Sequence, residues 1–112
     1  MTINIVHHGM EITPAIRGYV EEKMESLEKY AGDIQHVDVE VGRSTNHHQK
    51  GDVFECKAVM SVGGRVIRIQ KEEQDLYKAI DKVRDHLRAE LSDAKERLGD
   101  KISKDTNDEV SL

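Results

Sequence analysis

DVFECKAVMSVGGRVIRIQK, residues 52–71, decides the fold, because it predicts two strands joined by a tight turn. Gly63 and Gly64 both tolerate positive φ, which a two-residue hairpin turn requires. That turn fixes three opposed pairs: Val62 with Arg65, Met60 with Ile67, and Ala58 with Ile69. Opposed residues share a face, and here the apolar side chains meet. The stretch therefore predicts an antiparallel hairpin of residues 52–62 and 65–71.

Two more strands are predicted upstream of the hairpin. Residues 34–42, IQHVDVEVG, alternate valine with polar side chains, as a half-buried strand does. Residues 2–7, TINIVH, place Ile3 and Ile5 on one face. The polar stretch at residues 44–51 is expected to be a loop before the hairpin.

Two amphipathic helices complete the set of predicted elements. The first begins at Pro14 after a Thr13 N-cap, and Gly32 fits the position just past its end. The second covers about residues 73–98. Each has one apolar stripe at helical spacing. These stripes are Ile16, Val20, Met24 and Leu27 in the first helix, and Leu76, Ile80, Val83, Leu87 and Leu91 in the second.

The predicted order is β-α-β-β-β-α, an α+β fold. Alternating strands leave one sheet face buried, and both single-striped helices should cover that face. We therefore expect a two-layer sandwich with a four-stranded mixed sheet, similar to double-stranded RNA-binding domains. The first two strands should be parallel through a right-handed crossover. Residues 1–98 form the predicted domain, and residues 99–112 a polar, disordered tail.

The composition limits the classes of function that are possible. The chain has 112 residues, 35% charged residues and a net charge of −5, which argues against indiscriminate nucleic-acid binding but allows a local basic face. A single cysteine excludes an internal disulfide. The stretch MTINIVHHG does not have the pattern of a signal peptide, so we expect none, and no apolar run approaches the roughly 20 residues that span a bilayer. We expect a cytoplasmic protein that acts as a monomer.

No residue pattern favours catalysis or a cofactor. His7 and His8 would point to opposite faces of a strand, and no second cysteine is present to build a zinc site. Cys56 lies on the inward face of its strand, where a cysteine behaves as a small apolar residue. Phosphate-binding and nucleophile motifs are absent from the sequence. We therefore expect neither an enzyme nor a metal protein.

The second helix carries more cations than its fold requires. Arg84, Arg88 and Lys95 fall on one flank of the apolar stripe together with Tyr77. Asp81 and Asp85 are spaced to neutralise some of these charges within the helix. Two interpretations remain open: a solvated charged face, or a surface that contacts a phosphate backbone.

Three segments of the sequence resemble a known family. They are MTINIVHHGMEITPAIRGYVEEKMESLEKY (residues 1–30), VGGRV (62–66) and DLYKAID (75–81). The family is that of the short ribosome hibernation factors, which includes ribosome-associated inhibitor A, or protein Y. The resemblance covers about residues 1–98.

The resemblance implies a function without catalysis or a cofactor. Such a factor binds 16S rRNA of the small (30S) ribosomal subunit at the mRNA/tRNA decoding channel. It blocks access of tRNA and mRNA under stress. RNA phosphates would supply affinity and shape would supply specificity.

The residues expected to bind RNA come from both helices. They are Lys23, Lys29, Lys78, Lys82, Arg84, Arg88, Lys95 and Arg97. The chain departs from the family at His86, Ala89 and Asp93, which stand where lysine, arginine and lysine are usual. These losses leave an alternative: a divergent member that binds a protein partner through its mixed-charge helix face.

Overall fold

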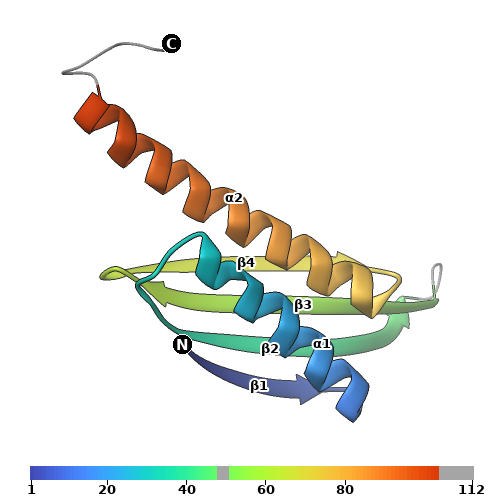
Figure 1. Cartoon of the computed structure of the whole chain (residues 1–112). Helices are drawn as coiled ribbons and strands as arrows, with labels where there is room; N and C mark the ends of the chain where they lie inside the picture. The colour runs from blue at the N-terminus through green and yellow to red at the C-terminus, as the bar shows by residue number, and fades with distance from the viewer. Residues whose placement is uncertain (48–50, 104–112) are drawn as a thin grey trace.

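The computed structural model describes residues 1–47 and 51–103. Its elements are β1 (Thr2–His8), α1 (Pro14–Glu25), the 3-10 turn η1 (Ser26–Lys29), β2 (Ile34–His47), β3 (Gly51–Val62), β4 (Arg65–Glu73) and α2 (Leu76–Ser103). The strands form one sheet in the order β1-β2-β3-β4. β1 is parallel to β2, and the other pairs are antiparallel. Both helices lie on the same face of the sheet (Figure 1), so the predicted α+β sandwich is confirmed.

The β3–β4 hairpin has the predicted register. Val62 pairs with Arg65, Met60 with Ile67 and Ala58 with Ile69. Gly63 and Gly64 have φ of 55° and 81°. Both lie in the left-handed region that glycine enters without a steric penalty. The turn chemistry therefore fixes the strand pairing.

The core lies between the sheet and the helices. Among the residues whose side chains the structure describes, the buried ones are apolar or cysteine. The helices contribute the predicted stripes, with Val20, Met24, Ile80, Val83 and Leu87 fully buried. The inward faces of the strands contribute Val37, Val39, Val41, Cys56, Ala58 and Met60. The apolar residues that repeat every two positions in the strands and every 3.6 positions in the helices thus form one core.

The first helix begins as predicted but ends differently. The Thr13 Oγ1 accepts a hydrogen bond from the Ile16 N–H at 3.1 Å, and Pro14 is the first helical residue. The α-helix stops at Glu25, and η1 follows. Ser26 donates its hydroxyl to the Lys23 carbonyl at 2.6 Å, a local bond of the kind that serine makes near a helix end. The expected capping role of Gly32 was therefore wrong, since the turn already ends at Lys29.

The expected loop at residues 44–51 was also wrong over most of the length that the structure describes. β2 continues to His47, and β3 begins at Gly51. Ser44 pairs with Val53 and His47 with Gly51, with a register shift between them. Polar side chains do not prevent a strand when the neighbouring backbone completes its hydrogen bonds. Residues 48–50 lie outside the described residues.

The second helix is displaced relative to its predicted bounds. β4 continues to Glu73, and α2 begins at Leu76. The Asp75 carboxylate accepts a hydrogen bond from the Tyr77 N–H at 2.9 Å, as an N-cap does. At its other end α2 extends beyond the sheet (Figure 1). It continues to Ser103, so residues 99–103 of the expected tail are helical, and residues 104–112 lie outside the described part of the chain.

Candidate nucleic-acid interface

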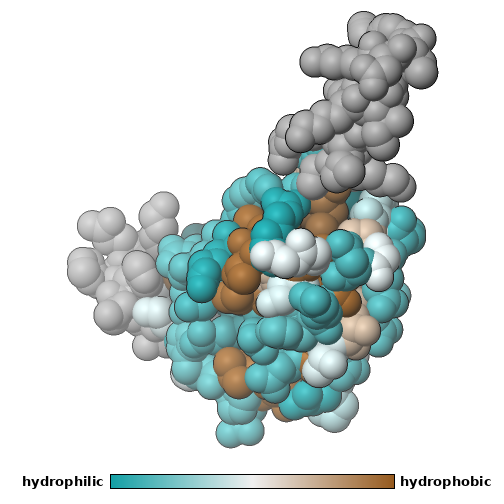
Figure 2. All heavy atoms as spheres, turned by 90° about the vertical axis from the view of Figure 1, so that its left-hand side faces the viewer, coloured by the Kyte–Doolittle hydropathy of each residue, from teal (hydrophilic) through white to brown (hydrophobic). Residues whose placement is uncertain are grey.

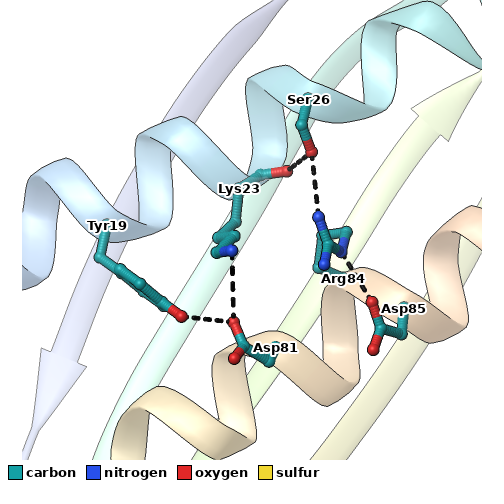
Figure 3. A network of polar contacts seen from close by, with 6 residues as sticks. All are labelled: Tyr19, Lys23, Ser26, Asp81, Arg84 and Asp85. Atoms are coloured by element: carbon teal, nitrogen blue, oxygen red, sulfur yellow. Dashed lines mark hydrogen bonds and ion pairs between the residues drawn. The ribbon is translucent and has the colours of Figure 1, made fainter.

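A polar network joins the two helices on the side away from the sheet core (Figure 3). The Tyr19 hydroxyl of α1 donates to Asp81 Oδ1 of α2 at 2.6 Å. Lys23 Nζ lies 3.8 Å from the same oxygen. The hydrogen bond to Asp81, helped by partial burial, raises the pKa of Tyr19 to about 12. Asp81 thus connects two groups of α1 to α2.

Arg84 lies one turn further along α2 in the same network (Figure 3). Its Nε donates to Asp85 Oδ1 at 2.8 Å, and its Nη1 lies 3.5 Å from Ser26 Oγ of η1. Only 23% of the Arg84 side chain is exposed. The guanidinium is therefore held beside α1, with part of its surface left to solvent.

Two aromatic rings pack beside this network. Tyr19 and Tyr77 meet edge to face, with ring centroids 4.7 Å apart and an interplanar angle of 88°. Lys23 Nζ also lies 5.1 Å from the Tyr19 ring centroid, a cation–π distance. Tyr77 remains 39% exposed. Two members of the predicted flank of α2, Tyr77 and Arg84, therefore face α1 and η1.

The other cations predicted to bind RNA, where the structure describes them, lie elsewhere on α2 and on η1. Arg88 and Lys78 are exposed on α2. Lys82 forms an ion pair with Glu73, and Lys29 in η1 lies 5.5 Å from the Tyr30 ring centroid. The side chains of Lys95 and Arg97 are outside the described part of α2. The structure thus brings Lys23 and Arg84 into one network, and leaves Lys29, Lys78 and Lys82 outside it.

Sequence reasoning placed Lys23 of the first helix among the RNA-binding residues, but it missed the contacts that join α1 to α2 at this site. It assigned Asp81 and Asp85 to neutralisation within α2, but Asp81 instead bonds Tyr19 and Lys23 across the helix pair. It also passed over Tyr19. A signal was present, because Tyr19 and Lys23 are four residues apart and so share one helix face.

A separate hollow lies at the end of the domain near the hairpin tip. It has a volume of about 490 Å³ and is lined by Lys29, Tyr30, Asp33, Gly63, Arg65 and Leu91, among others. Figure 2 views the molecule from the side where this hairpin end lies, and shows a mostly hydrophilic surface with small apolar patches. The hollow is lined by both cations and carboxylates, so it has no preference for one charge sign.

Cys56 and two kinds of feature were considered in the described part of the chain, a metal-binding cluster and a membrane-spanning helix. Cys56 is buried, and burial raises the pKa of its thiol to about 12. No group of three or more histidine, cysteine or carboxylate side chains in residues 1–47 and 51–103 is arranged to hold a metal ion. Within the same ranges, no helix is long and apolar enough to cross a membrane. The helix pair is the candidate site because it brings Lys23 and Arg84 into one polar network.

The chain is similar to proteins of a known family. Residues 3–99 match the family model described as Sigma 54 modulation protein / S30EA ribosomal protein. The chain is 36% identical over 98 residues to a ribosome hibernation promoting factor of Klebsiella oxytoca, covering 88% of this chain and 97% of that protein. It is 34% identical over 97 residues to one from Azotobacter vinelandii, covering 87% and 85%.

Solved structures agree with the fold. The Thermus thermophilus Protein Y N-terminal domain matches with a TM-score of 0.66 and 30% identity, over 82% of this chain and 97% of that one. A ribosomal subunit interface protein from Coxiella burnetii shares the fold with a TM-score of 0.74 at 24% identity, over 86% of this chain and 99% of that one. The match over residues 3–99 and the two similar relatives show that this chain belongs to the Sigma 54 modulation protein / S30EA ribosomal protein family.

Proposed function

We propose that this chain is a ribosome hibernation factor, a cytoplasmic translation inhibitor that binds the small ribosomal subunit under stress. Family membership supports this proposal, as do relatives of similar length that are named ribosome hibernation promoting factors. The single observation that carries it is the cation-bearing helix pair, which stands on the face opposite the open side of the sheet.

The proposed target is 16S rRNA at the mRNA/tRNA decoding channel. A folded domain placed there excludes tRNA and mRNA by volume alone, so inhibition requires no reaction and no cofactor. The proposed contacts are made by Lys23, Lys29, Lys78, Lys82, Arg84, Arg88, Lys95 and Arg97. Phosphate contacts of this kind orient a protein on RNA, and RNA shape then supplies the selectivity.

The contacts fall into two kinds. Arg88 and Lys78 are exposed and can approach a phosphate directly. Lys23 and Arg84 are held in place by Asp81 and Asp85, so they are already oriented before RNA arrives. The same carboxylates compete with phosphate for these cations. Affinity should therefore be moderate and strongly dependent on salt.

The ion pairs also support a second candidate function, binding of a protein partner through the mixed-charge helix face. Lys82 with Glu73 and Arg84 with Asp85 already neutralise part of that face. A protein interface with an apolar core weakens less with salt than a phosphate interface does. Salt dependence therefore distinguishes the two functions.

A displacement assay tests the proposed mechanism. Fluorescently labelled tRNA is bound to small subunits with a short mRNA, and increasing amounts of the chain are added. We expect release of tRNA by the wild type and weaker release by Lys78→Gln with Arg88→Gln. Arg68→Gln with Lys57→Gln, which removes two cations from the open sheet face, is the matched control and should behave as the wild type. Retention of tRNA at saturating wild-type protein would contradict exclusion from the decoding channel.

A further inference from the structure

Tyr77 is an exposed aromatic ring among the cations of the helix pair. Its exposed fraction is 39%. The other exposed large hydrophobic side chains in the described residues are Val6 and Val66, which lie on strands. Tyr77 is therefore the exposed large hydrophobic residue of the described helices, and it packs against Tyr19, whose ring lies 5.1 Å from Lys23 Nζ.

The Tyr77 ring is fixed in position by its neighbours. Its neighbour Tyr19 packs edge to face at 4.7 Å, and Tyr19 is itself fixed by the 2.6 Å hydrogen bond to Asp81. The Tyr77 backbone is anchored by its N–H bond to Asp75. A ring fixed in this way loses little conformational freedom when a ligand binds, which favours its use as a contact.

The surroundings of the ring define the ligand chemistry. An unpaired RNA base has a flat π face for stacking on an aromatic ring, and it carries a phosphate within reach of neighbouring cations. Lys23 and Arg84 belong to the same network as Tyr19, against which Tyr77 packs, and Lys78 follows Tyr77 in the chain. A paired base inside a duplex has no free face to offer. The arrangement therefore fits single-stranded RNA.

We propose that Tyr77 is a stacking platform for one unpaired base of the bound RNA, and that Tyr19 and Asp81 position it. This proposal rests on the proposed function and adds to it a contact that reads an unstacked nucleotide rather than a phosphate. The phenol oxygen has no part in it, so the ring alone is required.

Three variants test the platform in binding to purified small subunits. Tyr77→Phe keeps the ring and should bind within about twofold of the wild type. Tyr77→Leu keeps apolar packing but loses the π face, and it should bind about tenfold more weakly or worse. Its dependence of log affinity on log salt should keep the wild-type slope, because no phosphate contact is lost. Val66→Ala, an exposed apolar change on β4, is the control and should bind normally.

Chemical probing of 16S rRNA supplies a readout that a purely structural role would not change. In the Tyr77→Leu complex, reactivity should rise at one or two unpaired nucleotides, while the rest of the footprint stays. Probing is done at protein concentrations that saturate the subunits, and thermal unfolding confirms that the variant is folded. If Tyr77→Leu is destabilised, Tyr77→Phe and the footprint still decide the question.

The outcomes separate this proposal from the function on which it rests. If the wild type binds and Tyr77→Leu binds equally well, the platform is refuted and the hibernation function stands. If Tyr77→Phe loses as much affinity as Tyr77→Leu, the hydroxyl rather than the ring makes the contact, and the platform is again refuted. If the wild type does not bind small subunits, the proposed function fails and the platform fails with it.

Discussion

The Arg84 guanidinium forms an ion pair with the carboxylate of the next residue, Asp85. Its Nε lies 2.8 Å from Asp85 Oδ1, and 52% of the Asp85 side chain is exposed. A carboxylate in that place satisfies the guanidinium in the free protein and occupies a position that an RNA phosphate would take. Under the proposed function, single residues of this kind would set the affinity of the site for RNA.

Neutralising that carboxylate should strengthen binding. Asp85→Asn frees one Arg84 donor for phosphate, so we expect higher affinity for small subunits and a steeper salt dependence, with a slope larger by about one. Titrations at several salt concentrations measure both quantities. Asp38→Asn on the open sheet face changes net charge equally and serves as the control. Equal gains in the two variants would show a general charge effect instead.

The raised pKa values of Tyr19 and Cys56 predict a loss of stability in alkali. In the folded chain the pKa of each group is raised to about 12. In the unfolded chain the tyrosine ionises at about 10 and the cysteine at about 8.5. The unfolded state therefore binds fewer protons above about pH 9, and the free energy of unfolding should fall as the pH rises from there.

Urea titrations at about pH 7, 9 and 10.5 measure this decline. Tyr19→Phe should show a shallower decline above about pH 10, and an identical decline would contradict the role of its hydrogen bond.

At the scale of elements, sequence patterns predicted the features that neighbouring residues determine. They failed for the features that contacts with distant parts of the chain determine. The register of β3 and β4 follows from the Gly63-Gly64 turn and alternating side chains, which are all local. The end of β2 at His47 depends on pairing with Gly51. In the candidate site, helical spacing grouped Tyr77 with Arg84. It did not show that this flank faces α1, because the chain between the helices determines which surfaces meet.

Replacing glycine by alanine should have opposite effects on stability in α1 and in the hairpin turn. Gly18 lies in the helix interior, and nothing lies within 4 Å of the place that an alanine Cβ would take, so Gly18→Ala should stabilise the fold by about 0.5–1 kcal/mol. Gly64 has open space too, but its φ is +81°, so Gly64→Ala should destabilise by about 1–2 kcal/mol. Urea unfolding of both variants tests the contrast. A stabilising Gly64→Ala would refute the turn conformation.

The packing of α2 on the sheet should depend on its apolar stripe. Leu87 is fully buried, so Leu87→Ala should lower the free energy of unfolding by about 2–5 kcal/mol. Val66→Ala on the exposed side of β4 should change it by less than about 0.5 kcal/mol. Chemical denaturation measures both. A small effect at Leu87 would mean that α2 does not pack as described.

Across the whole molecule the two faces differ in what they offer RNA. The open sheet face carries Asp38, Glu40, Glu55 and Glu72 beside Lys57 and Arg68. The opposite face carries the helix pair (Figure 1). The helices are not basic as a whole, since α1, η1 and α2 together contain ten cations and ten carboxylates. RNA binding on the helix face would therefore depend on individual exposed cations rather than on an excess of positive charge.

Co-sedimentation with purified small subunits at low and moderate salt tests the central claim most directly. The wild type should bind near one to one and weaken steeply with salt. Arg84→Gln with Arg88→Gln should lose most binding, whereas Lys57→Gln with Arg68→Gln should keep it. Absence of wild-type binding at low salt, or equal binding by both double variants, would contradict an RNA interface on the helix pair.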